Sequence, residues 1–289
     1  MRDSNIRIGV DIGRSHIIAG LVNTQTRSLI AGSLIKKNID STEISGFIIN
    51  EWLQTIKSIM HDDYQVDEIG IAIPGPFDYE KGISLICNQD IFGSLYGVNV
   101  KQLLSNGLGL KNNKFVMKND ASCFLLGEVY GGSLAGFDNV IGITIGTGLG
   151  SAFYIDGKVK DANLWRMPFM NGIAEDYIST RWFVKRWKEL TNFEIKEVKE
   201  IVDSVGFRSE ISQLFDEFAK NLAKFLYIFI RKKRPSAVVL GGNIMFADDL
   251  FLHKVRKYLF NMMGISIPVT KSKHGEVATL LGAAYFFNS

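Results

Sequence analysis

Hydrophobic residues along the chain fall into short blocks, and two of these blocks share one internal pattern. The first, IGVDIGRSHIIAGLVN, covers residues 8–23, and the second, NVIGITIGTGLGSAFYIDGKV, covers residues 139–159. In each block a hydrophobic run leads into a turn rich in glycine or small polar residues, and a second hydrophobic run follows. This pattern is typical of a β-hairpin. The sequence therefore predicts two hairpins that lie roughly one domain apart.

The other hydrophobic blocks predict that strands and helices follow each hairpin. Helical spacing is clear after the first hairpin, where Ile44, Phe47 and Ile48 begin a series that continues to Ile56. In the first half the pattern predicts strands at 28–35, 68–73 and 114–117, and helices at 43–60, 99–106 and 120–131. In the second half it predicts helices at 174–190, 194–204, 208–232 and 277–287, a strand within SAVVLGGNIMF and a strand at 267–270. The order predicts an α/β fold in two lobes.

Composition and charge narrow the class of protein. The chain has 289 residues, of which 46% are hydrophobic and 22% charged, and its net charge is only +3. We expect a globular protein with no nucleic-acid or membrane partner, because a charge this small gives no reason to expect one. The polar start, Met1 to Arg7, does not resemble a signal peptide, so we expect a cytoplasmic location. Cys87 and Cys123 are isolated, which favours neither a disulfide framework nor a cysteine zinc site.

The turns of the two hairpins are the candidate chemistry. Glycine lets backbone N–H groups converge on a phosphate, because no Cβ obstructs them. Neither turn matches the Walker A or dinucleotide-binding patterns, and either turn alone is equally typical of an ordinary tight turn. The pairing favours two lobes that grip one polyphosphate. The candidate residues are Asp11, Gly13 and Ser15 in the first hairpin and Thr147, Gly148 and Gly150 in the second.

Six segments, in this order, resemble the ROK family of sugar kinases and repressors within the actin-like ATPase superfamily. They are DIGRS at 11–15, the IPGPFD strand and turn, NDASCFLLGE at 119–128, GITIGTGLG at 142–150, VVLGGNI at 238–244 and ATLLGAA at 278–284. The resemblance implies a ribonuclease H-like fold of two lobes with a nucleotide and sugar cleft between them. We place the N-terminal lobe at 1–119 with the helix 276–289, and the C-terminal lobe at 120–275.

The resemblance also implies roles for individual residues. The two hairpin turns would hold the phosphates of ATP, and Gly241 and Gly242 would hold the adenosine. Asp120 aligns with the family's general base, although an aspartate at the start of a helix is also typical of an N-cap. Asp11 is the expected outer partner of Mg²⁺. The expected sugar contacts are Asn88, Asn119 and Glu175, and for Asn88 and Glu175 the capping of a turn or helix is an equal alternative.

The chain departs from the family's pattern after the second hairpin. The family's kinases have Gly-Glu-x-Gly-His there, followed by zinc-binding cysteines, whereas this chain has ANLWRMP at 162–168 and no cysteines. His16 also stands where the family often has lysine. Three interpretations remain open: Arg166 reads an acidic substrate, Arg166 pairs with Glu175 in place of zinc, or the sugar site has decayed.

These observations predict an ATP-dependent kinase of a sugar or sugar-like polyol, and the resemblance implies that the acceptor is the 6-hydroxyl of a hexose or N-acetylhexosamine. The nucleotide turns and Asp120 are intact while the changes concentrate at the sugar, which favours altered specificity over lost chemistry. A non-catalytic sensor of nucleotide or sugar is the alternative. Only seven residues precede the first hairpin, so the DNA-binding function of the family's repressors is not expected. The resemblance further implies a homodimer.

Overall fold

The computed structural model describes residues 5–60, 66, 68–87 and 91–288. The chain forms two compact units. Unit 1 contains residues 1–135 and 276–289, and unit 2 contains residues 136–275. None of the helices in the described part of the chain is long and apolar enough to cross a membrane.

Unit 1 is built on a sheet in which the strands follow the order β3-β2-β1-β5-β8, with β4 paired to β2. Its strands are β1 (Ile6–Ile12), β2 (His16–Asn23), β3 (Ser28–Leu29), β4 (Ile35–Asn38), β5 (Ile69–Ile73) and β8 (Phe115–Asn119). The strands β1, β5 and β8 run parallel, with Asp11 level with Ala72 and Ala72 level with Lys118. The carboxyl ends of these three strands therefore meet at one edge of the sheet.

Four α-helices and a small hairpin of two short strands complete the described part of unit 1. They are α1 (Ser45–Lys57), α2 (Val100–Leu108), α3 (Asp120–Gly131), α8 (Val277–Tyr285), and the strands β6 (Phe77–Asp78) and β7 (Ile83–Ser84). The predicted strand at 28–35 is two short strands instead, because the chain turns at Gly32, whose φ is +76°. The core includes fully buried Ile8, Ile71 and Trp52.

The close packing of α3 against α8 decides where unit 1 ends. A Cβ at Gly127 would overlap the carbonyl oxygen of Ala278, and a Cβ at Gly282 would overlap that of Cys123. The two helices approach this closely only because both positions are glycine. Helix α3 consequently belongs to unit 1, so the division falls after Ala135 and not between Asn119 and Asp120, where we placed it from the sequence.

Unit 2 is built on a second sheet with the order β11-β10-β9-β14-β15. Its strands are β9 (Asn139–Ile145), β10 (Leu149–Ile155), β11 (Lys158–Asp161), β14 (Ala237–Gly241) and β15 (Val269–Lys271), and a separate small hairpin pairs β12 (Pro168–Phe169) with β13 (Gly172–Ile173). Strands β9, β14 and β15 are parallel. As in unit 1, a hairpin is followed by parallel strands, which repeats the predicted order.

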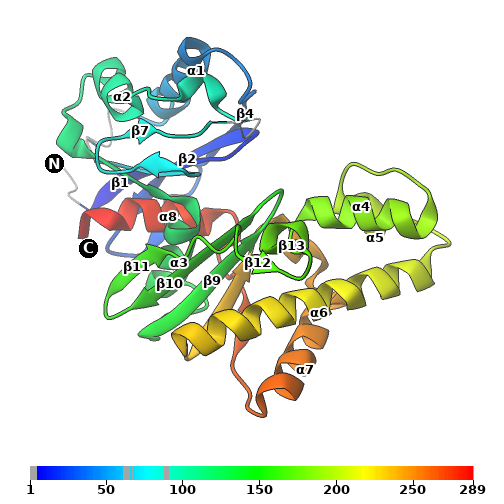
Figure 1. Ribbon diagram of the computed structural model, residues 1–289. Helices are drawn as coiled ribbons and strands as arrows, with labels where there is room; N and C mark the ends of the chain where they lie inside the picture. Colours follow the sequence, from blue (N-terminus) through cyan, green and yellow to red (C-terminus); the bar gives the residue numbers. More distant parts are fainter. Residues whose placement is uncertain (1–4, 61–65, 67, 88–90, 289) are drawn as a thin grey trace. The chain divides into compact units, whose positions relative to one another are not determined.

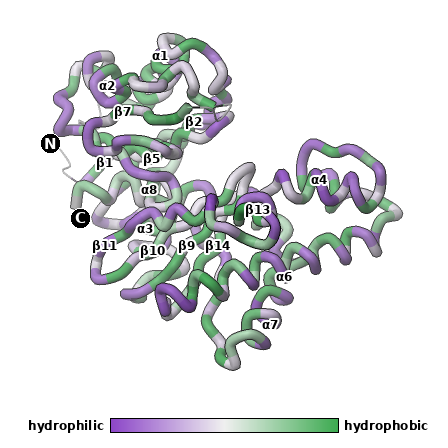
Figure 2. The backbone as a smooth tube through the Cα atoms, in the orientation of Figure 1, coloured by the Kyte–Doolittle hydropathy of each residue, from purple (hydrophilic) through white to green (hydrophobic). Residues whose placement is uncertain are grey.

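Helices of very different length make up the rest of unit 2. They are α4 (Thr180–Thr191), α5 (Val198–Val202), α6 (Arg208–Lys233) and α7 (Leu252–Met263), with the 3₁₀ turns η3 (Ala174–Asp176) and η4 (Asn243–Leu250). Figure 1 shows α6 as the longest of them, with α7 beside it. Hydrophobic and hydrophilic residues alternate along α6 in Figure 2. Its apolar stripe includes buried Phe218, Leu222 and Phe229, which is why a helix of 26 residues is stable here.

Candidate active site

The tip of the first hairpin, between β1 and β2, is closed by one backbone bond. The N–H of Gly13 donates to the carbonyl of His16 at 2.9 Å. The imidazole of His16 covers Gly13, since a Cβ there would lie 2.8 Å from the His16 Cε1. Within the described part of the chain, the N–H groups of Arg14 and Ser15 form no hydrogen bond. The tip thus presents two backbone donors, as an anion-binding turn requires.

A hollow of about 480 Å³ lies beside this tip. The N–H of Ile39 donates to the Ser15 carbonyl at 3.0 Å, which ties the end of β4 to the tip. The side of the hollow away from the tip is polar, because Asp40 accepts hydrogen bonds from the backbone and hydroxyl of Thr42. The residues that line it are Arg14, Ser15, Asn38, Ile39, Asp40, Ser41 and Thr42.

Asp11 is half-buried near the carboxyl end of β1. Burial raises the pKa of its carboxyl to about 8, and the negative charges of Asp120 and Glu276 act in the same direction, while Lys36 opposes them. The electrostatic coupling places Asp120 near Asp11, as the register of β1, β5 and β8 implies. At neutral pH this carboxyl is protonated unless a cation is bound to it.

The pair Asn119–Asp120 joins β8 to α3, and the structure separates the roles of its two members. Asn119 is the N-cap, and its side chain accepts the N–H of Ser122 at 3.1 Å. Asp120 is the first residue of α3, and its Oδ1 accepts the N–H of Ala121 at 2.8 Å. The capping alternative that the sequence left open for Asp120 therefore belongs to its neighbour.

Asn119 has a second contact, which bears on its expected role with a sugar. Its Nδ2 donates to the hydroxyl of Tyr79 at 3.4 Å, and that hydroxyl donates to the carbonyl of Ile73 at 3.2 Å. The amide is thus oriented by groups at the end of β5. Asn88, the other asparagine expected near the sugar, lies outside the described residues.

The second hairpin has a tip of three residues, Gly146, Thr147 and Gly148, between β9 and β10. The N–H of Gly146 donates to the Gly148 carbonyl at 3.0 Å. The N–H groups of Thr147 and Gly148 have no acceptor in the described ranges, and the side chain of Thr147 is exposed. Gly150 follows within β10, opposite Thr144. Both hairpins thus leave two amides available at the tip.

A second glycine turn lies at the same edge of this sheet. Gly241 ends β14 level with Thr144 of β9. Gly242 has a φ of +89°, and a Cβ at this position would overlap the carbonyl oxygen of Ile145. Only glycine readily adopts this φ and also lets the backbone lie this close to the Ile145 carbonyl. Unit 2 therefore brings Gly241 and Gly242 beside the hairpin tip, as expected if they serve one ligand.

Glu175 and Arg166 are not paired, which corrects one interpretation from the sequence. The Glu175 Oε2 accepts the N–H of Leu149 at 2.9 Å, and its Oε1 forms an ion pair with Arg181. Arg166 is exposed, with its guanidinium carbon 4.2 Å from the centre of the Trp165 ring. The prediction failed because the partner, Arg181, comes from the first turn of α4. A basic residue two positions after the helix cap Ser179 was the signal in the sequence.

The carboxylate side chains near the first hairpin fit a cation that is held mainly by the phosphate oxygens of a bound ligand. No group of three or more histidine, cysteine, aspartate or glutamate side chains in the described ranges is arranged to hold a metal ion. Asp11, repelled by Asp120, is nevertheless a carboxyl that a cation would stabilise in its ionised form. Mg²⁺ commonly takes one or two carboxylates together with phosphate oxygens and water, and this arrangement fits that pattern.

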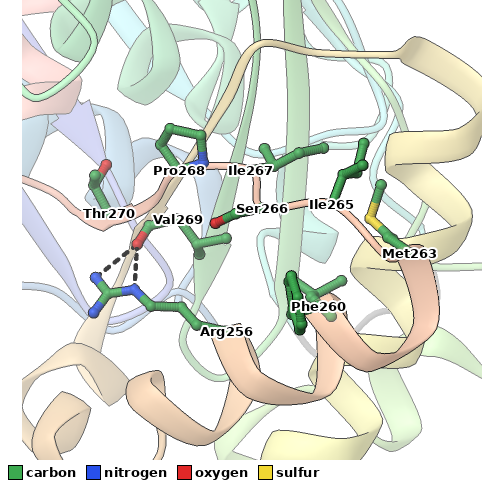
Figure 3. Close-up of a pocket in the computed structure, with 10 residues that line it drawn as sticks. Arg256, Phe260, Met263, Ile265, Ser266, Ile267, Pro268, Val269 and Thr270 are labelled. Carbon is green, nitrogen blue, oxygen red and sulfur yellow. Dashed lines mark hydrogen bonds between the residues drawn. The ribbon is translucent and has the colours of Figure 1, made fainter.

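Unit 2 has a further hollow, of about 320 Å³, at the opposite edge of its sheet. Figure 3 shows the Arg256 guanidinium forked onto the carbonyl of Val269, with N–O distances of 2.7 and 3.0 Å. Val269 begins β15, whereas the glycine turns lie where the parallel strands end. Phe260 and Ile265 give this hollow an apolar lining. It is therefore distinct from the candidate phosphate-binding turns.

Comparison with known proteins identifies relatives along nearly the whole chain. The model of the ROK family matches residues 7–162 and 170–289, and the unmatched stretch contains Arg166. A glucokinase of Thermotoga maritima is 24% identical over 96% of this chain and 95% of its own length. An N-acetyl-D-glucosamine kinase of Photobacterium profundum is 23% identical over 96% of this chain and 97% of its own length.

A solved structure extends the comparison to three dimensions. It is a ROK family glucokinase from Streptomyces griseus in complex with glucose and AMPPNP. This structure aligns with a TM-score of 0.81 and 24% identity, covering 97% of this chain and 98% of the glucokinase. The likeness confirms the predicted α/β fold.

Proposed function

The chain belongs to the ROK family, and from this membership we propose that it is a sugar kinase that transfers the terminal phosphoryl group of ATP to a sugar hydroxyl. The observation that carries the proposal is the pair of glycine hairpins, each with two unengaged amides at its tip. The S. griseus glucokinase, whose structure contains glucose and an ATP analogue, supports the same assignment.

Backbone donors bind the nucleotide in this proposal. Gly13 and Ser15 form the phosphate-binding turn of unit 1, and Thr147, Gly148 and Gly150 form that of unit 2. Gly241 and Gly242 hold the adenosine, because they permit a close approach of backbone and ligand at the edge that carries the second tip. Amides that are already oriented toward the phosphates cost little reorganisation during transfer.

Asp120 is the proposed general base. It accepts the proton of the attacking hydroxyl as the sugar oxygen bonds to the terminal phosphorus of ATP, and ADP leaves with the electrons of the broken P–O bond. It lies at the first residue of α3, directly after the helix cap Asn119, and its electrostatic coupling to Asp11 places it near the carboxyl ends of the parallel strands. General-base catalysis of this kind contributes roughly 10²–10⁴ in rate.

Asp11 is the residue that would hold Mg²⁺ through the phosphates. The ion supplies charge neutralisation on the phosphates when it is bound. Asp11 itself then stays ionised, although burial favours its protonated form in the free protein.

We propose that the acceptor is the 6-hydroxyl of a hexose or N-acetylhexosamine. Asn119 and Asn88 are proposed to orient the sugar, with Arg166 as a specificity residue. Glu175 is proposed to contact the sugar as well, since each of its oxygens has one partner in unit 2 and can accept a second hydrogen bond. The named relatives act on such sugars: glucokinase on glucose, and the other kinase on N-acetyl-D-glucosamine. A homodimer remains a prediction from the resemblance, and a cytoplasmic location remains a prediction from the polar start of the sequence.

A non-catalytic sensor is the weaker candidate. Such a protein has no need of a general base, whereas the carboxyl of Asp120 lies at the start of α3 and is coupled to Asp11. The residues that differ from the family's pattern lie around Arg166, which argues for altered sugar preference.

The test is release of ADP from Mg²⁺-ATP across neutral hexoses, N-acetylhexosamines, uronic acids and polyols. We expect sugar-dependent turnover that falls by 10²–10⁴ in Asp120→Asn. Asp156→Asn is the matched control, because Asp156 is exposed in the β10–β11 turn and its φ of +52° suits asparagine. A preference for uronic acids that disappears in Arg166→Ala would assign the acid-reading role to Arg166. ATP binding without turnover on any acceptor would instead favour the sensor.

A further inference from the structure

A single carboxylate supports the tip of the second hairpin. Glu175 projects from η3, where its own N–H donates to the Trp165 carbonyl at 3.1 Å. Its Oε2 accepts the N–H of Leu149 at 2.9 Å, and a Cβ at Gly148 would lie 2.7 Å from the same oxygen. Only 16% of the side chain is exposed. The carboxylate therefore packs directly against the turn that we assign to the phosphates.

A negative charge in this place opposes the binding of a polyphosphate. Charges separated by a few ångströms interact appreciably even at the dielectric of a protein surface. The hydrogen bond from Leu149 orders the turn, but it needs only an acceptor oxygen and not a charge. Something must therefore cancel the charge of Glu175 if the turn is to receive an anion.

Arg181 is the cation in contact with that carboxylate. It lies in the first turn of α4, and its Nη2 pairs with the Oε1 of Glu175. The preceding residue, Thr180, donates its N–H to the Gly146 carbonyl at 2.8 Å. Two consecutive residues of one helix thus hold the tip, one through the backbone and the other through Glu175.

We propose that Arg181 is a positioning residue for nucleotide binding, which neutralises Glu175 and keeps its carboxylate on the Leu149 amide. This inference rests on the proposed function, because it takes the ligand of the second tip to be the phosphates of a nucleotide. It gives Glu175 a role at the nucleotide turn in addition to the sugar contact that the sequence suggested.

The experiment measures the affinity for Mg²⁺-ADP by calorimetry without any sugar, so it does not depend on turnover. We expect Arg181→Ala to weaken binding about three- to tenfold at low salt, and less at 0.5 M salt, where charges are screened. Glu175→Gln keeps an acceptor for the Leu149 amide and removes the charge. Adding it to Arg181→Ala should restore the affinity to within about twofold of the wild type.

Two further variants separate this effect from general damage. Lys185→Ala removes an exposed positive charge one turn along α4 and should leave the affinity within about twofold. Arg181→Lys retains the charge and should bind nearly as well as the wild type. Circular dichroism establishes that each variant is folded.

Each outcome bears on one proposal or the other. A wild-type protein that does not bind Mg²⁺-ADP would overturn the nucleotide function and this inference with it. Normal wild-type binding with no loss in Arg181→Ala would overturn the positioning role alone. A loss that Glu175→Gln does not rescue would mean that Arg181 braces the fold, and the neutralising role would be wrong.

Discussion

Replacing Asp11 by asparagine should make the stability of unit 1 less dependent on pH. Burial and the charges of Asp120 and Glu276 raise the pKa of the Asp11 carboxyl from 3.8 to about 8 in the folded protein. Between these values the folded state binds one more proton than the unfolded state. The contribution of Asp11 to stability is therefore fully present below about pH 4 and is lost as the pH rises toward 8.

The slope follows from the number of protons. One proton of difference changes the free energy of unfolding by about 1.4 kcal/mol per pH unit. Between pH 5 and pH 7 the wild type should lose about 2.5 kcal/mol relative to Asp11→Asn. This difference in slope does not depend on any constant effect of the amide on packing.

Urea unfolding combined with pulsed hydrogen exchange of β1 and β5 peptides reports on unit 1 separately from unit 2. The control is Asp78→Asn. The N–H of Lys81 donates to the Asp78 carboxylate and lowers its pKa, so that group is ionised in both states above pH 5. The free energy of unfolding of Asp78→Asn should therefore change with pH in parallel with that of the wild type. A free energy of unfolding of the wild type relative to Asp11→Asn that stays constant from pH 5 to pH 7, or rises, would refute the reasoning.

Three other predictions concern binding and packing. Mg²⁺-ATP binding at pH 7 should release about 0.9 proton in the wild type and none in Asp11→Asn, as measured by calorimetry in buffers of different ionisation enthalpy. Asn119→Ala should lower the free energy of unfolding by about 1 kcal/mol, because Ser122 loses its capping acceptor, and Asn119→Asp should not. Gly282→Ala should cost about 3 kcal/mol in urea unfolding, because the new Cβ would overlap the Cys123 carbonyl; an unchanged midpoint would contradict this.

The elements that local pattern determines were predictable from the sequence. Both hairpins form where hydrophobic runs flank glycine turns, and α3 covers the predicted residues 120–131. The prediction of a single strand at 28–35 was wrong, because the chain turns at Gly32 and Ser33 and forms the two short strands β3 and β4. The Ser33 hydroxyl donates to the Ile30 carbonyl at 2.7 Å, a local bond that competes with strand geometry.

The unit boundary and the Glu175 partner depended on contacts between distant residues. Helix α3 belongs to unit 1 because α8, about 150 residues later, packs against its glycine face. The sequence provided the small residues of both helices but not their pairing. Likewise, Arg166 and Arg181 are both arginines near Glu175 in sequence, but only Arg181 forms the ion pair, while Arg166 lies over the Trp165 ring.

The two hairpins present the same pair of backbone amides, but the acid beside each pair is neutralised in a different way. Each tip leaves a pair of amides for an anion, and each has an acid close to it, Asp11 in unit 1 and Glu175 in unit 2. At neutral pH a bound proton neutralises Asp11, whereas the guanidinium of Arg181 neutralises Glu175. A proton can be exchanged for a cation that arrives with the phosphates, but an ion pair within the chain cannot. Ligand-linked proton release should therefore originate at the first hairpin.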